Sequence, residues 1–294
     1  MIFKGTATAL ITPFIGNGVD YDSLKKLIDF QIENGVNALV VLGTTGEPAT
    51  MSHEEKEHVI QTAITHTNKR VPVIVGAGSN STKTAIEMCQ NAQRLGADAL
   101  LVVTPYYNKC TQEGLVEHYN AIANATTLPV LCYNVQSRTG VNMLPSTFEK
   151  IARNKNIVGI KEASGNMEQI EKYIALCKDM EKEVYSGDDA LTVPIMAMGG
   201  AGVISVASNA FPKYVSAMTE YALDSNIKRA SEMQLKMLPL ISALFCEVNP
   251  IPIKTAMGIL GKCDGALRLP LTKMSDEHKK MLEKVLDDFA KLTL

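Results

Sequence analysis

The chain has 294 residues, enough for one large barrel or two ordinary domains, and its 46% hydrophobic and 20% charged content is that of a globular protein. Its 29 basic and 31 acidic residues are well mixed, which argues against a nucleic-acid-binding stripe and favours a small molecule as the partner. No apolar run approaches the roughly 18 residues that cross a bilayer. Six cysteines without a CxxC pair argue against a structural zinc site, and the N-terminus lacks a secretion-signal pattern. We therefore expect a cytoplasmic protein, with no nucleic-acid or membrane partner and no cofactor.

Short apolar runs alternate along the chain with amphipathic stretches of helical period. The runs predict strands at 7–11, 38–42, 71–75, 99–103, 129–133, 157–161, 184–186 and 203–206. The amphipathic stretches predict helices at 21–34, 52–68, 81–95, 112–125, 145–153, 166–178, 189–198 and 212–222. The segment 52–55 reads Ser-His-Glu-Glu, a capping-box pattern that supports a helix start there.

Eight strand-then-helix units in succession predict an α/β fold, a parallel (β/α)8 TIM barrel, over residues 1–223. An open doubly wound sheet is the alternative, but the glycine-rich segment 76–81 does not complete the GxGxxG pattern of that fold. After residue 223 the alternation stops, and three further helices are predicted at 224–247, 250–261 and 275–292. We interpret residues 224–294 as a helical C-terminal extension of the one barrel.

The active site of such a barrel lies at the carboxyl ends of its strands. The predicted strand ends carry an amine, three phenols and several hydroxyl groups, at 43–47, 104–108, 133–134, 161–162, 186–188 and 205. All five histidines, at positions 53, 58, 66, 118 and 278, fall within predicted helices. A metal-dependent aldolase needs imidazole ligands at this mouth, so we expect no metal site.

Lys161 ends the apolar run 156–161, which reads as a strand buried on both faces. Burial disfavours the charged form of a lysine and lowers its pKa. A neutral amine is a nucleophile that forms a Schiff base with a carbonyl substrate. The plain alternative is a lysine that reaches water or pairs with Glu162.

The turn Gly43–Glu47, together with Tyr133 and Lys161 at two successive strand ends, resembles the pyruvate-dependent class I aldolase superfamily. That superfamily includes dihydrodipicolinate synthases and N-acetylneuraminate lyases. Four further segments resemble the dihydrodipicolinate synthases in particular, at 104–108, 137–140, 249–254 and 267–270. The resemblance runs from Thr6 to about Leu271, nearly the whole chain.

The resemblance implies a Schiff-base condensation of pyruvate with aspartate β-semialdehyde to 4-hydroxy-tetrahydrodipicolinate, the first committed step of diaminopimelate and lysine biosynthesis. Lys161 would carry pyruvate as an imine and enamine, while Tyr133 would shuttle protons through Thr44 to Tyr107. In the family that last tyrosine comes from a neighbouring subunit. The resemblance therefore implies a homo-oligomer, with a homotetramer built as a dimer of dimers.

The same resemblance implies the substrate-binding groups. Backbone N–H groups of Thr44 and Thr45 would hold the pyruvate carboxylate, while Arg138 would offer a planar fork to the semialdehyde carboxylate. Gly187 and Ile204 would line the pyruvate pocket. Gln136 departs from the family, which usually has proline there, and this puts the rigidity of the Arg138 loop in doubt.

Other interpretations stay open at this point. A sialic acid or 2-keto-3-deoxy sugar acid lyase would use the same lysine, although it would need hydroxyl-reading groups in place of Arg138. A non-catalytic sensor of pyruvate-like ligands is possible because fold does not fix function. A phosphate-binding barrel would use the glycine-rich segment 199–202, which has no basic neighbour. Taken singly, the tyrosines and threonines could also be ordinary packing and capping residues.

Many members of the family bind free lysine between subunits. The matching positions here are Pro48, Ala49, His53, Lys56, Asn80, Thr84 and Tyr106. Lys56 puts a cation there, and Thr84 stands where an acidic partner is expected, so a cationic amino acid meets repulsion without compensation. We predict weak or absent inhibition by lysine; an inhibition assay with a half-maximal effect at sub-millimolar lysine would contradict this.

Overall fold

The computed structural model describes residues 1–292 and closes eight parallel strands into one barrel. The strands are β1 (Gly5–Ala9), β4 (Ala38–Val41), β5 (Val73–Gly76), β6 (Ala99–Val103), β7 (Val130–Asn134), β8 (Ile157–Glu162), β9 (Glu183–Ser186) and β10 (Gly202–Ser205). From β4 to β10, each strand pairs with the strand that follows it along the chain. The barrel closes because β1 pairs with both β4 and β10. Every predicted strand overlaps one of these, so the (β/α)8 barrel is confirmed.

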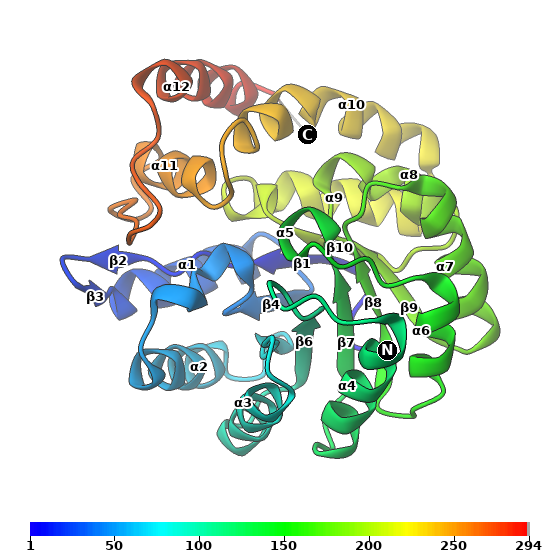
Figure 1. Cartoon of the computed structure of the whole chain (residues 1–294). Coiled ribbons are helices and arrows are strands. Elements are labelled where there is room, and N and C mark those ends of the chain that lie inside the picture. The colour runs from blue at the N-terminus through cyan, green and yellow to red at the C-terminus, as the bar shows by residue number, and fades with distance from the viewer. Residues whose placement is uncertain (293–294) are drawn as a thin grey trace.

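Helices follow the strands and surround the barrel (Figure 1). They are α1 (Tyr21–Glu33), α2 (His53–Thr67), α3 (Thr82–Leu95), α4 (Gln112–Asn124), α6 (Pro145–Ala152), α7 (Met167–Asp179), α8 (Thr192–Ala197) and α9 (Pro212–Leu223). The predicted capping box at the start of α2 is confirmed, because Ser52 and Glu55 each bond the other's backbone N–H. Among residues 1–292, no helix combines the length and apolar character that crossing a membrane requires.

Some short elements were not predicted. They are the hairpin β2 (Phe14–Ile15) and β3 (Gly18–Val19), the one-turn helix α5 (Gln136–Thr139), and the 3-10 turns η1 (Thr44–Gly46), η2 (Pro48–Thr50) and η4 (Ala207–Asn209). The predicted helix 189–198 is divided into the 3-10 turn η3 (Asp189–Leu191) and α8. Segments of two to four residues are too short to show a hydrophobic period. Most of them lie in the loops that follow the strands.

The chain ends in three helices, α10 (Ile227–Leu244), α11 (Ile251–Ile259) and α12 (Asp276–Ala290), which lie together at one side of the barrel (Figure 1). α10 packs against α8 and α9. The Phe289 ring of α12 meets the rings of Phe211 and Tyr214 edge-on, with centroids 4.8 Å apart in both pairs. The three predicted C-terminal helices are therefore present and packed on the barrel. The boundary at residue 223 stays a prediction.

The apolar core has two layers, one between strands and helices and one inside the barrel. Inside, the Phe3 ring stacks on Tyr185 with centroids 4.4 Å apart, and the Tyr185 hydroxyl donates to the Phe3 carbonyl over 2.7 Å. Tyr185 is the register partner of Lys161 on the neighbouring strand β8. The packed interior leaves the carboxyl ends of the strands as the place for a site.

Candidate active site

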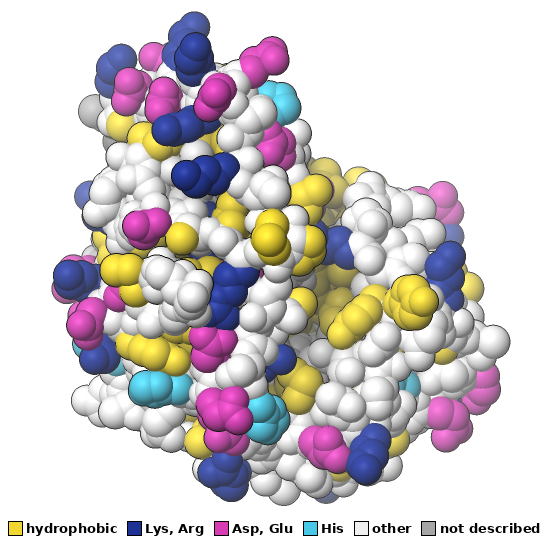
Figure 2. All heavy atoms as spheres, turned by 60° about the vertical axis from the view of Figure 1, so that its left-hand side comes forward, with side chains coloured by type: hydrophobic (Ala, Val, Ile, Leu, Met, Phe, Trp, Pro, Cys, Tyr) yellow, Lys and Arg dark blue, Asp and Glu magenta, His cyan; other side chains and the backbone are white. Residues whose placement is uncertain are grey.

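A cavity of about 400 Å3 lies at the carboxyl ends of the strands. It brings together six of the residues predicted from the sequence, which are Thr44, Thr45, Tyr133, Arg138, Lys161 and Gly187. They come from the ends of β4, β7, β8 and β9 and the loops that follow. Figure 2 shows one face of the molecule, where a hollow with hydrophobic side chains is visible and charged side chains of both signs are mixed over the surface.

Lys161 is the central group of this cavity. It is 6% exposed, and its Nζ lies 4.3 Å from the ring centroid of Tyr133, its register partner on β7. Burial lowers the pKa of Lys161 to about 7; the charge of Arg138 acts in the same direction, and that of Asp189 opposes it. A large share of this amine is therefore neutral near pH 7, as a nucleophile must be.

Glu162 is not the partner of Lys161. Its carboxylate accepts hydrogen bonds from Asn134 Nδ2 over 2.9 Å and from the Ser164 N–H over 2.7 Å. Side chains of successive strand residues point to opposite faces, so Glu162 faces the surrounding helices while Lys161 faces the barrel axis. Within residues 1–292, Lys161 forms no ion pair. The expected alternative of a Lys161–Glu162 pair is therefore wrong.

Tyr133 carries the phenol nearest to the amine. Burial raises the pKa of Tyr133, while the charge of Arg138 and the nearby Thr44 hydroxyl act in the opposite direction. The phenol is thus protonated near neutral pH and stands beside both the amine and a hydroxyl group. This arrangement suits a proton shuttle.

Thr44 and Thr45 open the 3-10 turn η1 that follows β4. The N–H groups of Gly46 and Glu47 close the turn by donating to the carbonyls of Gly43 and Thr44, over 2.9 and 3.2 Å. In the part of the chain that the structure describes, the N–H groups of Thr44 and Thr45 have no such carbonyl partner. They are available to a carboxylate bound in the cavity.

Arg138 lies on α5, at the rim of the cavity. Its Nη2 donates to the carbonyl of Asn249 over 3.0 Å, and the next residue, Thr139, accepts a hydrogen bond from Thr104 over 3.1 Å. Gln136 is the first residue of α5, a position that suits proline but does not need it. The loop is therefore held by a helical turn and by contacts at both sides, even without the family's proline.

Three further predicted site residues, Gly187, Ile204 and Tyr107, lie beside the amine, in the inner core and at the surface, respectively. A Cβ on Gly187 would lie 2.9 Å from Cε of Lys161, so glycine is what leaves room beside the amine. Ile204 is 1% exposed and packs in the inner core of the barrel, and it is not among the residues that line the cavity. Tyr107 is 89% exposed and lies outside the cavity.

Two residues of the site were not predicted. Asn249 donates from Nδ2 to the Thr45 hydroxyl over 3.0 Å, and its carbonyl accepts from Arg138. The segment 249–254 resembles the family in sequence, but the sequence alone indicated no role for Asn249. Asp189 accepts hydrogen bonds from the N–H groups of Val206 and Ala207, over 3.0 and 3.1 Å, and its charge acts on Lys161. Its only signal in the sequence was an acidic residue three positions after the end of β9.

A cavity of about 580 Å3 adjoins the site and includes several positions of the family's lysine site. These are Pro48, Ala49, Lys56, Thr84 and Tyr106. Lys56 and Thr84, the two departures from the family, thus line one cavity. The weak response to lysine stays a prediction.

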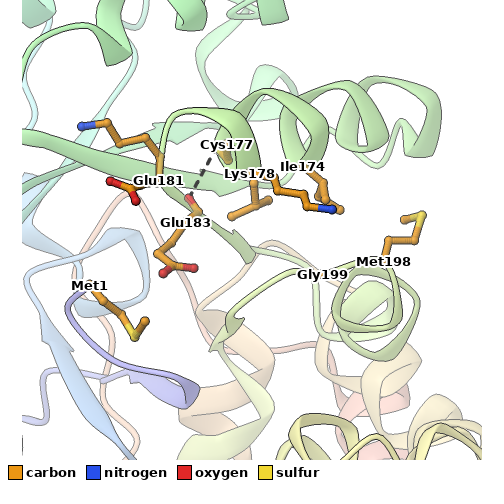
Figure 3. A pocket seen from close by; sticks show the side chains of 10 residues that line it. Met1, Ile174, Cys177, Lys178, Glu181, Glu183, Met198 and Gly199 are labelled. Atoms are coloured by element: carbon orange, nitrogen blue, oxygen red, sulfur yellow. Dashed lines mark hydrogen bonds between the residues drawn. The ribbon is translucent and has the colours of Figure 1, made fainter.

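Another cavity, of about 410 Å3, lies near the amino-terminal end of β9 (Figure 3). Its thiol, Cys177, lies 3.9 Å from the Glu183 carbonyl, and burial raises the pKa of that thiol to about 12. A protonated thiol is a poor nucleophile.

The glycine-rich segment 199–202 also lies at the amino-terminal end of the strands, because it leads into β10. This position removes the basis for a phosphate site at the mouth of the barrel. Residues 1–292 contain no cluster of potential metal ligands.

Comparison with known proteins agrees with this geometry. The sequence pattern of the Dihydrodipicolinate synthetase family matches residues 2–289. The 4-hydroxy-tetrahydrodipicolinate synthase of Geobacter metallireducens is 49% identical over 288 residues, which cover 98% of this chain and 99% of that protein. The synthase of Alkaliphilus oremlandii is 49% identical over 290 residues, covering 99% of both chains.

Solved structures show the same likeness. The dihydrodipicolinate synthase of Thermotoga maritima superposes with a TM-score of 0.98 at 43% identity, covering 99% of this chain and 100% of that one. The Acinetobacter baumannii enzyme, solved in complex with pyruvate, gives a TM-score of 0.95 at 43% identity with the same coverage.

Proposed function

This chain belongs to the dihydrodipicolinate synthetase family, and we propose that Lys161 is the Schiff-base nucleophile with which it condenses pyruvate and aspartate β-semialdehyde. The product is 4-hydroxy-tetrahydrodipicolinate, so the enzyme is a class I aldolase-type lyase of diaminopimelate and lysine biosynthesis. The observation that carries the proposal is the buried, unpaired amine of Lys161 beside the phenol of Tyr133.

The first half of the reaction makes a carbon nucleophile. The neutral amine of Lys161 attacks the keto carbon of pyruvate, and water leaves as the imine forms. The Tyr133 phenol, near the Thr44 hydroxyl, donates the proton that the departing water needs. Loss of a proton from the pyruvate methyl group then turns the imine into an enamine.

The second half joins the two substrates. The enamine carbon adds to the aldehyde carbon of the semialdehyde, and the amino group of that substrate then attacks the imine carbon. Ring closure breaks the bond to Lys161 and frees the amine, so one water is lost overall. The free N–H groups of η1 bind the pyruvate carboxylate, and Arg138 binds the semialdehyde carboxylate with its planar fork.

Arg138 favours the semialdehyde over a sugar acid as second substrate. A sugar-acid lyase has to read several hydroxyl groups, whereas this rim offers a guanidinium held by the Asn249 carbonyl. The relatives quoted above are synthases, in agreement with this choice.

Reductive trapping tests the nucleophile directly. With pyruvate and cyanoborohydride, intact mass and peptide mapping should show one adduct, on Lys161. Because the pKa of Lys161 is lowered to about 7, the neutral form is lost as pH falls below that value. The trapping rate should therefore fall about tenfold per pH unit below pH 7 and level off above it, whereas a free lysine side chain gains neutral amine up to about pH 10.

Lys161→Met is the matched control and should give no pyruvate-dependent adduct. A second control is internal, since the other deeply buried lysine, Lys254, is ion-paired with Glu47 and should stay unmodified. An adduct on any residue other than Lys161 would refute the assignment, and so would a rate independent of pH between 5.5 and 7.

Arg138→Met tests the choice of second substrate. The variant should lower kcat/KM for aspartate β-semialdehyde about a hundredfold, since a charge-assisted bidentate contact to a carboxylate is lost. Pyruvate trapping on Lys161 should persist. The assay should be run at pH 8, because the Arg138 charge also lowers the pKa of Lys161. If kcat/KM falls by the same factor for pyruvate as for aspartate β-semialdehyde, the assigned role of Arg138 is wrong.

We further propose that the protein works as a homo-oligomer, a homotetramer built as a dimer of dimers, in which Tyr107 of one subunit completes the proton path of another. Two observations support an intersubunit role. Tyr107 is 89% exposed and lies outside the cavity of its own chain. Its φ of 71° places a bulky residue in the left-handed region, a strain that is often found at functional sites.

Subunit mixing tests this path. Tyr107→Phe and Lys161→Met should each be nearly inactive alone. After co-refolding, a hybrid site can combine an intact Lys161 with an intact Tyr107 from the other variant, so activity should return. Mixing of either variant with itself is the control. If sedimentation confirms hybrids but no activity returns, Tyr107 does not act across the interface.

A further inference from the structure

The structure contains a fully buried ion pair that the proposed mechanism does not use. Nζ of Lys254, on α11, lies 2.6 Å from Oε1 of Glu47, and the two side chains are 0% and 2% exposed. Lys254 also sits 3.9 Å above the ring of Phe14. The second oxygen of Glu47 has no hydrogen-bond partner among the described residues. Burying two charges costs about as much as their attraction returns, so this pair is poorly explained by stability alone.

Glu47 is placed where it can control the turn η1. It directly follows Thr44–Gly46, and its own N–H closes the turn by donating to the Thr44 carbonyl. Its φ of 53° lies in the left-handed region, which a glutamate adopts only when its surroundings enforce it. The anchored side chain supplies that enforcement, because Lys254 fixes its far end.

Other side chains hold the same turn from different directions. The Thr12 hydroxyl donates to the Gly46 carbonyl over 2.7 Å, and Asn249 donates to the Thr45 hydroxyl over 3.0 Å. Asn249 and Lys254 both belong to the C-terminal part of the chain, beyond the barrel helices. That part therefore supplies two of these three contacts.

We propose that Lys254, acting through Glu47, is a positioning residue for pyruvate. The pair holds η1 in the shape that directs the N–H groups of Thr44 and Thr45 into the cavity. Neither side chain is among those lining the wall around Lys161, so the role is indirect. The inference rests on the proposed function at Lys161. It adds that recognition of the pyruvate carboxylate depends on a charge supplied by the C-terminal helices.

The test removes both charges at once, since removing one would leave the other buried and unpaired. In Glu47→Gln/Lys254→Met, the pyruvate concentration for half-maximal trapping on Lys161 should rise about tenfold, the loss expected when a carboxylate's hydrogen bonds are misaligned. The maximal extent of trapping and the KM for the semialdehyde should change little. A role in stability alone would lower the melting temperature without moving the pyruvate dependence.

Glu55→Gln is the matched control. Glu55 pairs with Arg268 over 2.6 Å, so it also joins the barrel to the C-terminal part of the chain, but in the described part of the chain its side chain bonds only Ser52 and Arg268 and not η1. This variant should lower the melting temperature and keep the pyruvate dependence unchanged. If it raises the half-saturating concentration as much as the double variant does, general loosening is the cause and the proposal fails.

Unchanged half-saturation in a folded double variant would overturn the positioning role. If the double variant does not fold, Lys254→Met alone decides by the same criterion, because it removes the contact that fixes the far end of Glu47. If the protein without substitutions forms no pyruvate adduct, this is a separate result. It would overturn the Schiff-base assignment, and the positioning role with it.

Discussion

The desolvation of one amine is the constraint on which the rest of the site depends. Lys161 is buried and has no carboxylate partner within residues 1–292, and burial lowers its pKa to about 7. An adjacent carboxylate would undo this, because a paired amine stays protonated. Glu162, the nearest acid in sequence, is bound on the other face of β8 by Asn134 and Ser164. The alternation of side chains along the strand thus keeps the amine that we propose as the nucleophile away from the carboxylate that would hold it protonated.

The charges that do act on Lys161 are held at fixed positions. Asp189 raises its pKa and Arg138 lowers it, so the two partly oppose each other. Asp189 is fixed by the backbone N–H groups at the start of η4, and Arg138 by the carbonyl of Asn249. Fixed charges in a buried site need no rearrangement when the imine forms. The loops after β9, β10 and β7 therefore set the reactivity of a residue on β8.

The sequence allowed the barrel to be predicted and Lys161 to be proposed as the nucleophile, because buried strands and their ends follow from local rules. Buried parallel strands read as apolar runs, and strand ends place Tyr133 and Lys161 at one mouth. The contacts of Asn249 with Thr45 and of Lys254 with Glu47 join residues more than 200 positions apart, and no local period announces them. α5 is likewise a single turn, fixed by tertiary contacts of Arg138 and Thr139. Its shape is therefore a product of the packed fold.

The C-terminal helices consequently do more than cover the barrel. The Asn249 side chain donates to the Thr45 hydroxyl in the turn η1, and its backbone carbonyl accepts from Arg138. One residue thereby joins the two groups that we propose bind the two substrate carboxylates. The distance between the two carboxylates has to be correct for the enamine carbon to reach the aldehyde, since small misplacements of reacting atoms slow a reaction strongly. A barrel cut off after α9 would keep Lys161 and Tyr133, but it would lose the groups that set this distance.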